Sequence, residues 1–139
     1  MMSMTAKEYL SQAYRLDQRI ERKIEDRDRM RAKLQKATAQ ITGMPRGGSG
    51  VDWTELSVRA MEYDAKIARE MSELYRLKTE IEGVIAAVED QRYQRLLTLR
   101  YIDGKRWENI AVEMSYSWRR VMQMHHEALR AVIVPESLH

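Results

Sequence analysis

The side chains with the most specific chemistry lie between residues 117 and 126, in the segment SWRRVMQMHH. Arginine can donate two hydrogen bonds to the edge of one guanine, and glutamine can form a similar bidentate pair with adenine. A helix that begins at Ser117 would leave Arg119 and Gln123 exposed near its start. We therefore predict base contacts from Arg119 and Gln123, with Met122 and His126 as further candidates.

Nearby basic side chains suit a second kind of contact, because phosphate contacts position a protein on a duplex without reading its sequence. The candidates for phosphate contacts are Arg100, Lys105, Arg106 and Arg120. Ser117 can cap the helix and also contact a phosphate. Trp118 can either stack on a sugar or thymine methyl group or cover the turn before the helix. A solvated helix face is the plainer interpretation of the arginine pair, and the sequence leaves it open.

The sequence contains no recognisable catalytic motif. It lacks the phosphate-binding loop G-x-x-x-x-G-K-[ST] and the zinc-binding motif H-E-x-x-H, and it contains no cysteine. His125 and His126 are adjacent, so in a helix they point about 100° apart and cannot easily share one metal ion. We therefore predict that the protein is not an enzyme and uses neither a metal nor a cofactor.

The candidate contact residues need a scaffold, and residues 90–134 have the pattern of three short helices. The pattern predicts helices over residues 90–102, 107–114 and 117–132, with a turn at Asp-Gly-Lys 103–105. Ala111 is the small residue needed where the last two helices touch, and Ser115 occupies a turn position that often carries glycine. Apolar residues surround this turn: Ile110, Met114, Tyr116, Val121 and Met124. The spacing predicts a helix-turn-helix with Trp107 in its core.

The remaining residues, 1–89, have the pattern of two long helices. Residues 5–41 contain neither proline nor glycine, and Thr5 with Glu8 forms a potential capping box. Their apolar stripe is Leu10, Ala13, Ile20, Ile24, Leu34 and Ile41. After a hinge at 43–51, where Asp52 can cap the next helix, apolar residues recur every seven positions: Trp53, Ala60, Ile67, Leu74, Ile81 and Val88. Two helices of similar length joined by a short loop predict an antiparallel coiled-coil hairpin.

Charge and composition agree with this plan. Residues 5–41 carry a net charge of +4, residues 52–90 carry −5, and the whole chain carries +3. Opposite charges favour pairing of the two long helices, although a thin two-helix core also favours dimerisation or packing on another unit. The predicted fold is all-α, with a hairpin at 1–89, a helix-turn-helix at 90–134 and a tail at 135–139. No apolar run is long enough to span a bilayer, so no membrane partner is expected.

Residues 92–132 resemble region four of sigma-70-type factors, which reads a promoter element. The segments that carry the resemblance are LLTLRYIDGKRWENIAVEMSYS, RRVMQ and ALRAV. Positions 118, 119, 122 and 125 depart from that pattern, so the same DNA sequence is not implied. A long helical half before such a reader is similar to small phage regulators of the ArpU/RinA late-activator type. This resemblance implies a phage or prophage activator that binds double-stranded DNA, and the bacterial cytoplasm is the expected location. RNA polymerase is a further candidate partner, for the surface of the hairpin.

Two other functions stay open at this stage. The hairpin can serve as a protein-interaction adaptor that docks on RNA polymerase or another partner, and it can also form a homodimer. A small terminase-like DNA-packaging protein would likewise join coiled helices to a helix-turn-helix.

Overall fold

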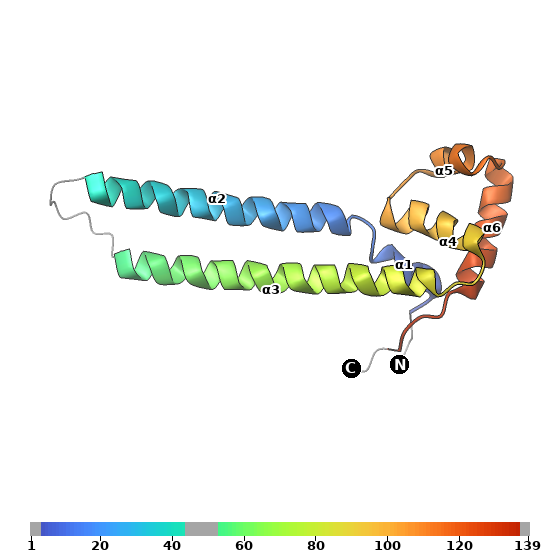
Figure 1. Cartoon of the computed structure of the whole chain (residues 1–139), viewed down its shortest axis with the longest axis horizontal. Helices are drawn as coiled ribbons and strands as arrows, with labels where there is room; N and C mark the ends of the chain where they lie inside the picture. The colour runs from blue at the N-terminus through green and yellow to red at the C-terminus, as the bar shows by residue number, and fades with distance from the viewer. Residues whose placement is uncertain (1–3, 44–52, 137–139) are drawn as a thin grey trace. The chain divides into compact units, whose positions relative to one another are not determined.

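The computed structural model describes residues 4–43 and 53–136, and these residues form helices and no strand. The helices are α1 (Ala6–Ser11), α2 (Leu16–Gly43), α3 (Trp53–Ala86), α4 (Gln91–Leu97), the π-helix η1 (Thr98–Ile102), α5 (Trp107–Met114) and α6 (Trp118–Ala131) (Figure 1). The all-α prediction is confirmed. Apart from Gly43, which ends α2, the predicted hinge and the Asp52 cap lie outside the described residues.

The chain divides into two compact units, and the first is made from both ends of the sequence. Residues 1–16 and 76–139 form this discontinuous unit, whereas residues 17–75 form the central unit. The predicted boundary between residues 89 and 90 does not coincide with this division. The segment before residue 17 belongs with the C-terminal helices, although its sequence pattern continues the apolar stripe of α2.

In the central unit, α2 and α3 run antiparallel (Figure 1). Ion pairs join Lys23 to Glu70 and Arg31 to Asp64, so residues later in α2 meet residues earlier in α3. The heptad residues of α3 form the buried face of this helix: Ala60, Ile67 and Leu74 are each no more than 8% exposed. On α2, Ile20 is buried, but Ile24 and Leu34 are only half-buried. The side chains of Ile41 and Trp53 lie outside the described residues.

The prediction of one continuous helix over residues 5–41 is wrong, because the chain turns between α1 and α2. Arg15 adopts a left-handed conformation, with φ of 67°. The side chains of Ser11 and Gln12 donate hydrogen bonds to the carbonyls of Lys7 and Tyr9, at 2.6 and 3.0 Å, at the end of α1. Polar groups that compete with the helix ladder in this way favour a helix end over continuation.

The helix α1 begins as predicted. The Glu8 amide donates to Thr5 Oγ1 and the Thr5 amide donates to Glu8 Oε1, each at 3.1 Å, which completes the capping box. Tyr9 and Leu10 are buried, and α1 contacts α6 within the discontinuous unit. The turn at residues 12–15 therefore lets a short N-terminal helix join the core around α6.

The core of the discontinuous unit lies among α1, the end of α3, α4, η1, α5 and α6. Its fully buried side chains include Leu10, Ile81, Leu96, Leu97, Ile110, Val121 and Met124. Gln94 of α4 links this helix to the end of α3, because its side-chain amide donates hydrogen bonds to the backbone carbonyls of Ala86 and Val88. The helix bounds at 107–114 and 118–131 agree with the predicted bounds to within one residue. Among the described helices, none combines the length and apolarity that crossing a bilayer would require.

Candidate nucleic-acid interface

The N-terminus of α6 is fixed by a side-chain cap. Ser117 lies in extended backbone, and its Oγ accepts a hydrogen bond of 3.0 Å from the Arg120 amide. The cap predicted from the sequence is therefore confirmed. It satisfies one of the free amides of the first turn and defines where the helix starts.

The turn between α5 and α6 has a defined geometry. Ser115 is left-handed, with φ of 58° and ψ of 39°. Its amide donates to the Val112 carbonyl at 3.2 Å, and the Tyr116 amide donates to the Ala111 carbonyl at 3.0 Å. This pair of bonds is the Schellman arrangement, which normally uses glycine at the left-handed position. Serine fills the position here, and the three-residue turn sets the direction in which α6 leaves α5.

One face of α6 is packed in the core, so the side chains of the other face are exposed to solvent. Val121, Met124, His125 and Ala128 are each no more than 4% exposed. The exposed side chains include Arg119, Gln123, His126 and Arg130, at spacings of four, three and four residues. At 3.6 residues per turn, these four positions fall on a single stripe along the helix. We call it the outer stripe of α6.

The residues predicted to contact DNA differ in their exposure and in the contacts that they make within the protein. Trp118, Arg119, Gln123 and His126 are exposed on α6, Ser117 is exposed at its cap, and Arg106 is exposed before α5. Arg120 and Met122 are half-buried, and the Arg120 guanidinium donates to Gln123 Oε1 at 3.2 Å. Lys105 forms an ion pair with Glu113 on α5. The side chains predicted to contact bases are thus brought together on one helix.

Arg100 is occupied by contacts within the protein. Its guanidinium lies 4.5 Å from the Trp107 ring centroid and 5.6 Å from that of Tyr14. It also donates a hydrogen bond of 3.0 Å to the Lys105 carbonyl. These contacts tie η1 to the start of α5, so Arg100 supports the site and is less available for a phosphate than predicted.

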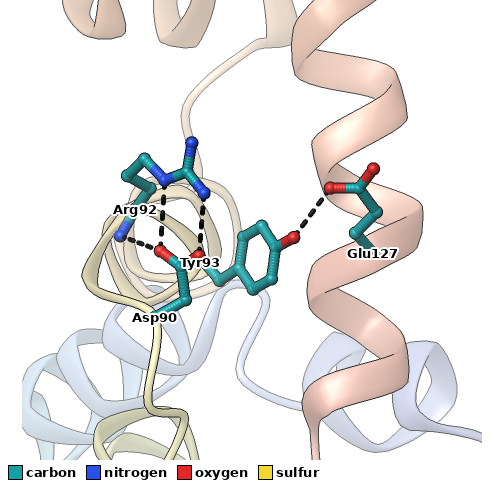
Figure 2. Close-up of polar contacts among 4 residues, drawn as sticks. All are labelled: Asp90, Arg92, Tyr93 and Glu127. Carbon is teal, nitrogen blue, oxygen red and sulfur yellow. Dashed lines mark hydrogen bonds and ion pairs between the residues drawn. The ribbon is translucent and has the colours of Figure 1, made fainter.

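A hydrogen bond between Tyr93 and Glu127 joins α4 to α6, and an ion pair between Asp90 and Arg92 lies at the start of α4 (Figure 2). The Tyr93 hydroxyl on α4 donates to Glu127 Oε2 on α6 at 2.7 Å. One turn earlier, Asp90 caps α4 by accepting from the Arg92 amide at 2.9 Å and also binds the Arg92 guanidinium. The bonds from Arg92 lower the pKa of Asp90, and the carboxylate of Glu127 raises the pKa of Tyr93. Sequence patterns give no signal for the Tyr93–Glu127 bond, which spans 34 residues.

An open cleft of about 530 Å³ lies beside α6 in the discontinuous unit. Its lining comes from α1, the turn after α1, η1, α5 and α6, and consists of Lys7, Ser11, Tyr14, Arg100, Tyr101, Trp107, Met122, His125, His126 and Leu129. Lys7 brings a positive charge from α1 to the side of α6. The sequence did not point to Lys7, because the turn that returns α1 to this unit was not predicted.

His125 lies at the floor of this cleft, in contact with two aromatic rings. Its Nε2 is 2.7 Å from the Tyr101 hydroxyl, and its ring centroid is 4.6 Å from that of Trp107, edge to face. Burial, together with the charges of His126, Lys7 and Arg100, lowers the pKa of His125 to about 4. The imidazole is therefore neutral at pH 7 and serves as a packed core group. The described residues contain no cluster of three metal-binding side chains.

Comparison of the chain with known protein families, with curated proteins and with solved structures finds no match.

Proposed function

We propose that the protein is a sequence-specific DNA-binding transcriptional regulator that reads the major groove with α6. The observation that carries this proposal is the outer stripe of α6. Arg119 and Gln123 are exposed on it, while the opposite face is packed into the core. The major groove of B-DNA is wide enough to admit one helix, and a helix presented in this way can reach base edges.

Charge at the start of α6 supports the same function. Acidic residues are favoured in the first turn of a helix, and α1, α3 and α5 carry Glu8, Glu55 and Glu108 there. The first turns of α4 and α6 have no acidic residue, and the first turn of α6 carries two arginines, Arg119 and Arg120. These positive charges cost stability at the positive end of the helix dipole, and a DNA phosphate near them would offset that cost.

The sequence resemblance extends the proposal to a phage or prophage activator that meets RNA polymerase on bacterial DNA. In this interpretation Ser117, Arg106 and Lys105 contact phosphates, and Arg119 and Gln123 contact bases. The adaptor and DNA-packaging functions compete with it, and DNA binding that depends on the outer stripe distinguishes regulation from a purely protein-binding adaptor.

The test begins by selecting a target duplex, because the sequence and the structure do not specify which bases the helix reads. The purified chain is used to enrich duplexes from a random pool, and the enriched duplex is then titrated by fluorescence anisotropy. Two bidentate contacts of about 1–3 kcal/mol each predict that Arg119→Ala with Gln123→Ala weakens binding at least about 30-fold. The matched control is Arg22→Ala with Gln18→Ala, which removes the same groups from exposed positions of α2.

Three outcomes would decide the matter. Loss of affinity in the α6 variant alone supports the proposal, and equal affinity of all three proteins for the enriched duplex refutes the assignment of α6. Failure to enrich any sequence, at low and at moderate salt, refutes sequence-specific binding altogether, since phosphate contacts strengthen as salt falls.

A further inference from the structure

A second regular stripe runs along α3, and it faces solvent. Its members are Val58, Met61, Ala65, Ala68, Ser72 and Tyr75, and all six are exposed. The three large side chains remain 47%, 70% and 49% exposed at Val58, Met61 and Tyr75. The spacing alternates between three and four residues throughout, which is the spacing of a coiled-coil seam.

This exposed stripe is distinct from the seam that already packs within the central unit. Within the central unit, the buried residues of α3 are Ala60, Ile67 and Leu74, which lie about 130° around the helix from the middle of the stripe at 3.6 residues per turn. A helix that needed only one partner would carry polar residues on its outer side. The outer side of α3 instead carries large side chains at both ends of the stripe and small ones at its centre, over about 26 Å.

We propose that this stripe is a homodimer interface, in which α3 of one copy packs antiparallel against α3 of a second copy. An antiparallel pair centred between Ala65 and Ala68 places Val58 opposite Tyr75 and Met61 opposite Ser72 of the second copy. Large residues then meet smaller or planar ones at the ends, and alanines meet at the centre, where the backbones can approach closely. A parallel pair would instead stack Met61 on Met61 and Tyr75 on Tyr75.

Charges beside the stripe fit the same antiparallel register. Glu62 and Arg69 lie seven residues apart on one flank of the stripe and are both exposed. The antiparallel register brings Glu62 of each copy opposite Arg69 of the other, so the symmetry creates two attractive pairs. In a parallel register Glu62 would face Ser57, and this pair would be lost. The partner that the stripe fits is therefore a second copy of the same helix.

This inference is independent of the proposed DNA binding, and sedimentation equilibrium of the full chain tests it. The wild type is expected to dimerise. Glu62→Arg and Arg69→Glu should each weaken the dimer about tenfold, because two attractive pairs become two repulsive ones. The double variant Glu62→Arg with Arg69→Glu restores the pairs and should restore the dimer. The controls Glu73→Arg and Lys66→Glu change exposed residues off the stripe and should leave dimerisation unchanged.

Cysteine cross-linking fixes the register, since the chain has no cysteine of its own. Two differently tagged chains, one with Ala65→Cys and one with Ala68→Cys, are mixed and oxidised. The antiparallel register predicts cross-links between the two kinds of chain in excess of cross-links within each kind. A chain that stays monomeric at its highest soluble concentration overturns the inference. So does a dimer that the flank variants do not weaken, a double variant that fails to recover, or cross-linking chiefly within each kind.

Discussion

The neutral state of His125 predicts that the protein loses stability in mild acid. In the unfolded chain the imidazole titrates near its ordinary pKa of 6.5, whereas burial holds the pKa at about 4 in the folded protein. Between these two values the unfolded state binds a proton that the folded state excludes. The contribution to stability is therefore complete above pH 6.5 and is lost progressively as the pH falls toward 4.

The size of this effect follows from the two pKa values. For a single group with pKa 6.5 unfolded and about 4 folded, lowering the pH from 7 to 5 reduces the free energy of unfolding by about 2 kcal/mol. His125 borders an open cleft, so solvent screens part of the penalty and about 1–2 kcal/mol is the expected loss. The pKa of Asp90 lies below its ordinary 3.8, so this carboxylate stays ionised throughout that range.

Urea denaturation followed by circular dichroism at pH 7, 6 and 5 measures the loss. The comparison protein is His125→Gln, which keeps a polar side chain opposite Tyr101 but cannot titrate. Its stability should fall less between pH 7 and 5 than that of the wild type, by about 1–2 kcal/mol. The exposed His126 provides a second control, because His126→Gln should keep most of the wild-type pH dependence. Equal pH dependence of the wild type and His125→Gln would refute the reasoning.

Three further predictions concern stability and can be measured by the same denaturation experiment at pH 7. Ser115→Gly should stabilise the protein by about 0.5–1 kcal/mol, because glycine removes the strain of the left-handed position; a loss of stability would contradict the assigned turn. Tyr93→Phe should lower the free energy of unfolding, because it removes the hydrogen bond to Glu127; unchanged stability would mean that this bond does not help to hold α4 against α6. Leu10→Ala should cost about 2–5 kcal/mol, as expected for a fully buried leucine; a cost below 1 kcal/mol would mean that α1 is not part of the core.

The sequence predicted the C-terminal helices well because local signals define their ends. Asp90 and Ser117 act as side-chain caps, Gly104 turns with φ of +68°, and the apolar spacing leaves one buried face on α6. The exposure of Arg119 and Gln123 follows directly from that spacing. Local signals therefore predicted the bounds of these helices and the exposure of these two side chains.

The features that the sequence failed to predict depend on contacts between distant residues. The turn at residues 12–15 interrupts a segment of good helix formers, and the packing of Leu10 in the core around α6 adds to the local hydrogen bonds of Ser11 and Gln12 in favouring it. The loss of Arg100 as a free cation depends on Trp107 at the start of α5 and on Tyr14 in the turn after α1. Helix propensity and periodicity describe neighbours along the chain, so neither could reveal these partners.

The discontinuous unit also constrains the order in which the protein can mature on the ribosome. The helix α1 is synthesised first, but α6, which it contacts, is synthesised about 100 residues later. At about 5–20 residues per second, the nascent chain must wait roughly 5–20 s before these two helices can meet. During that interval Leu10 and Tyr9 have no completed core to enter, so a nascent chain that lacks α6 leaves these two side chains without their final packing partners.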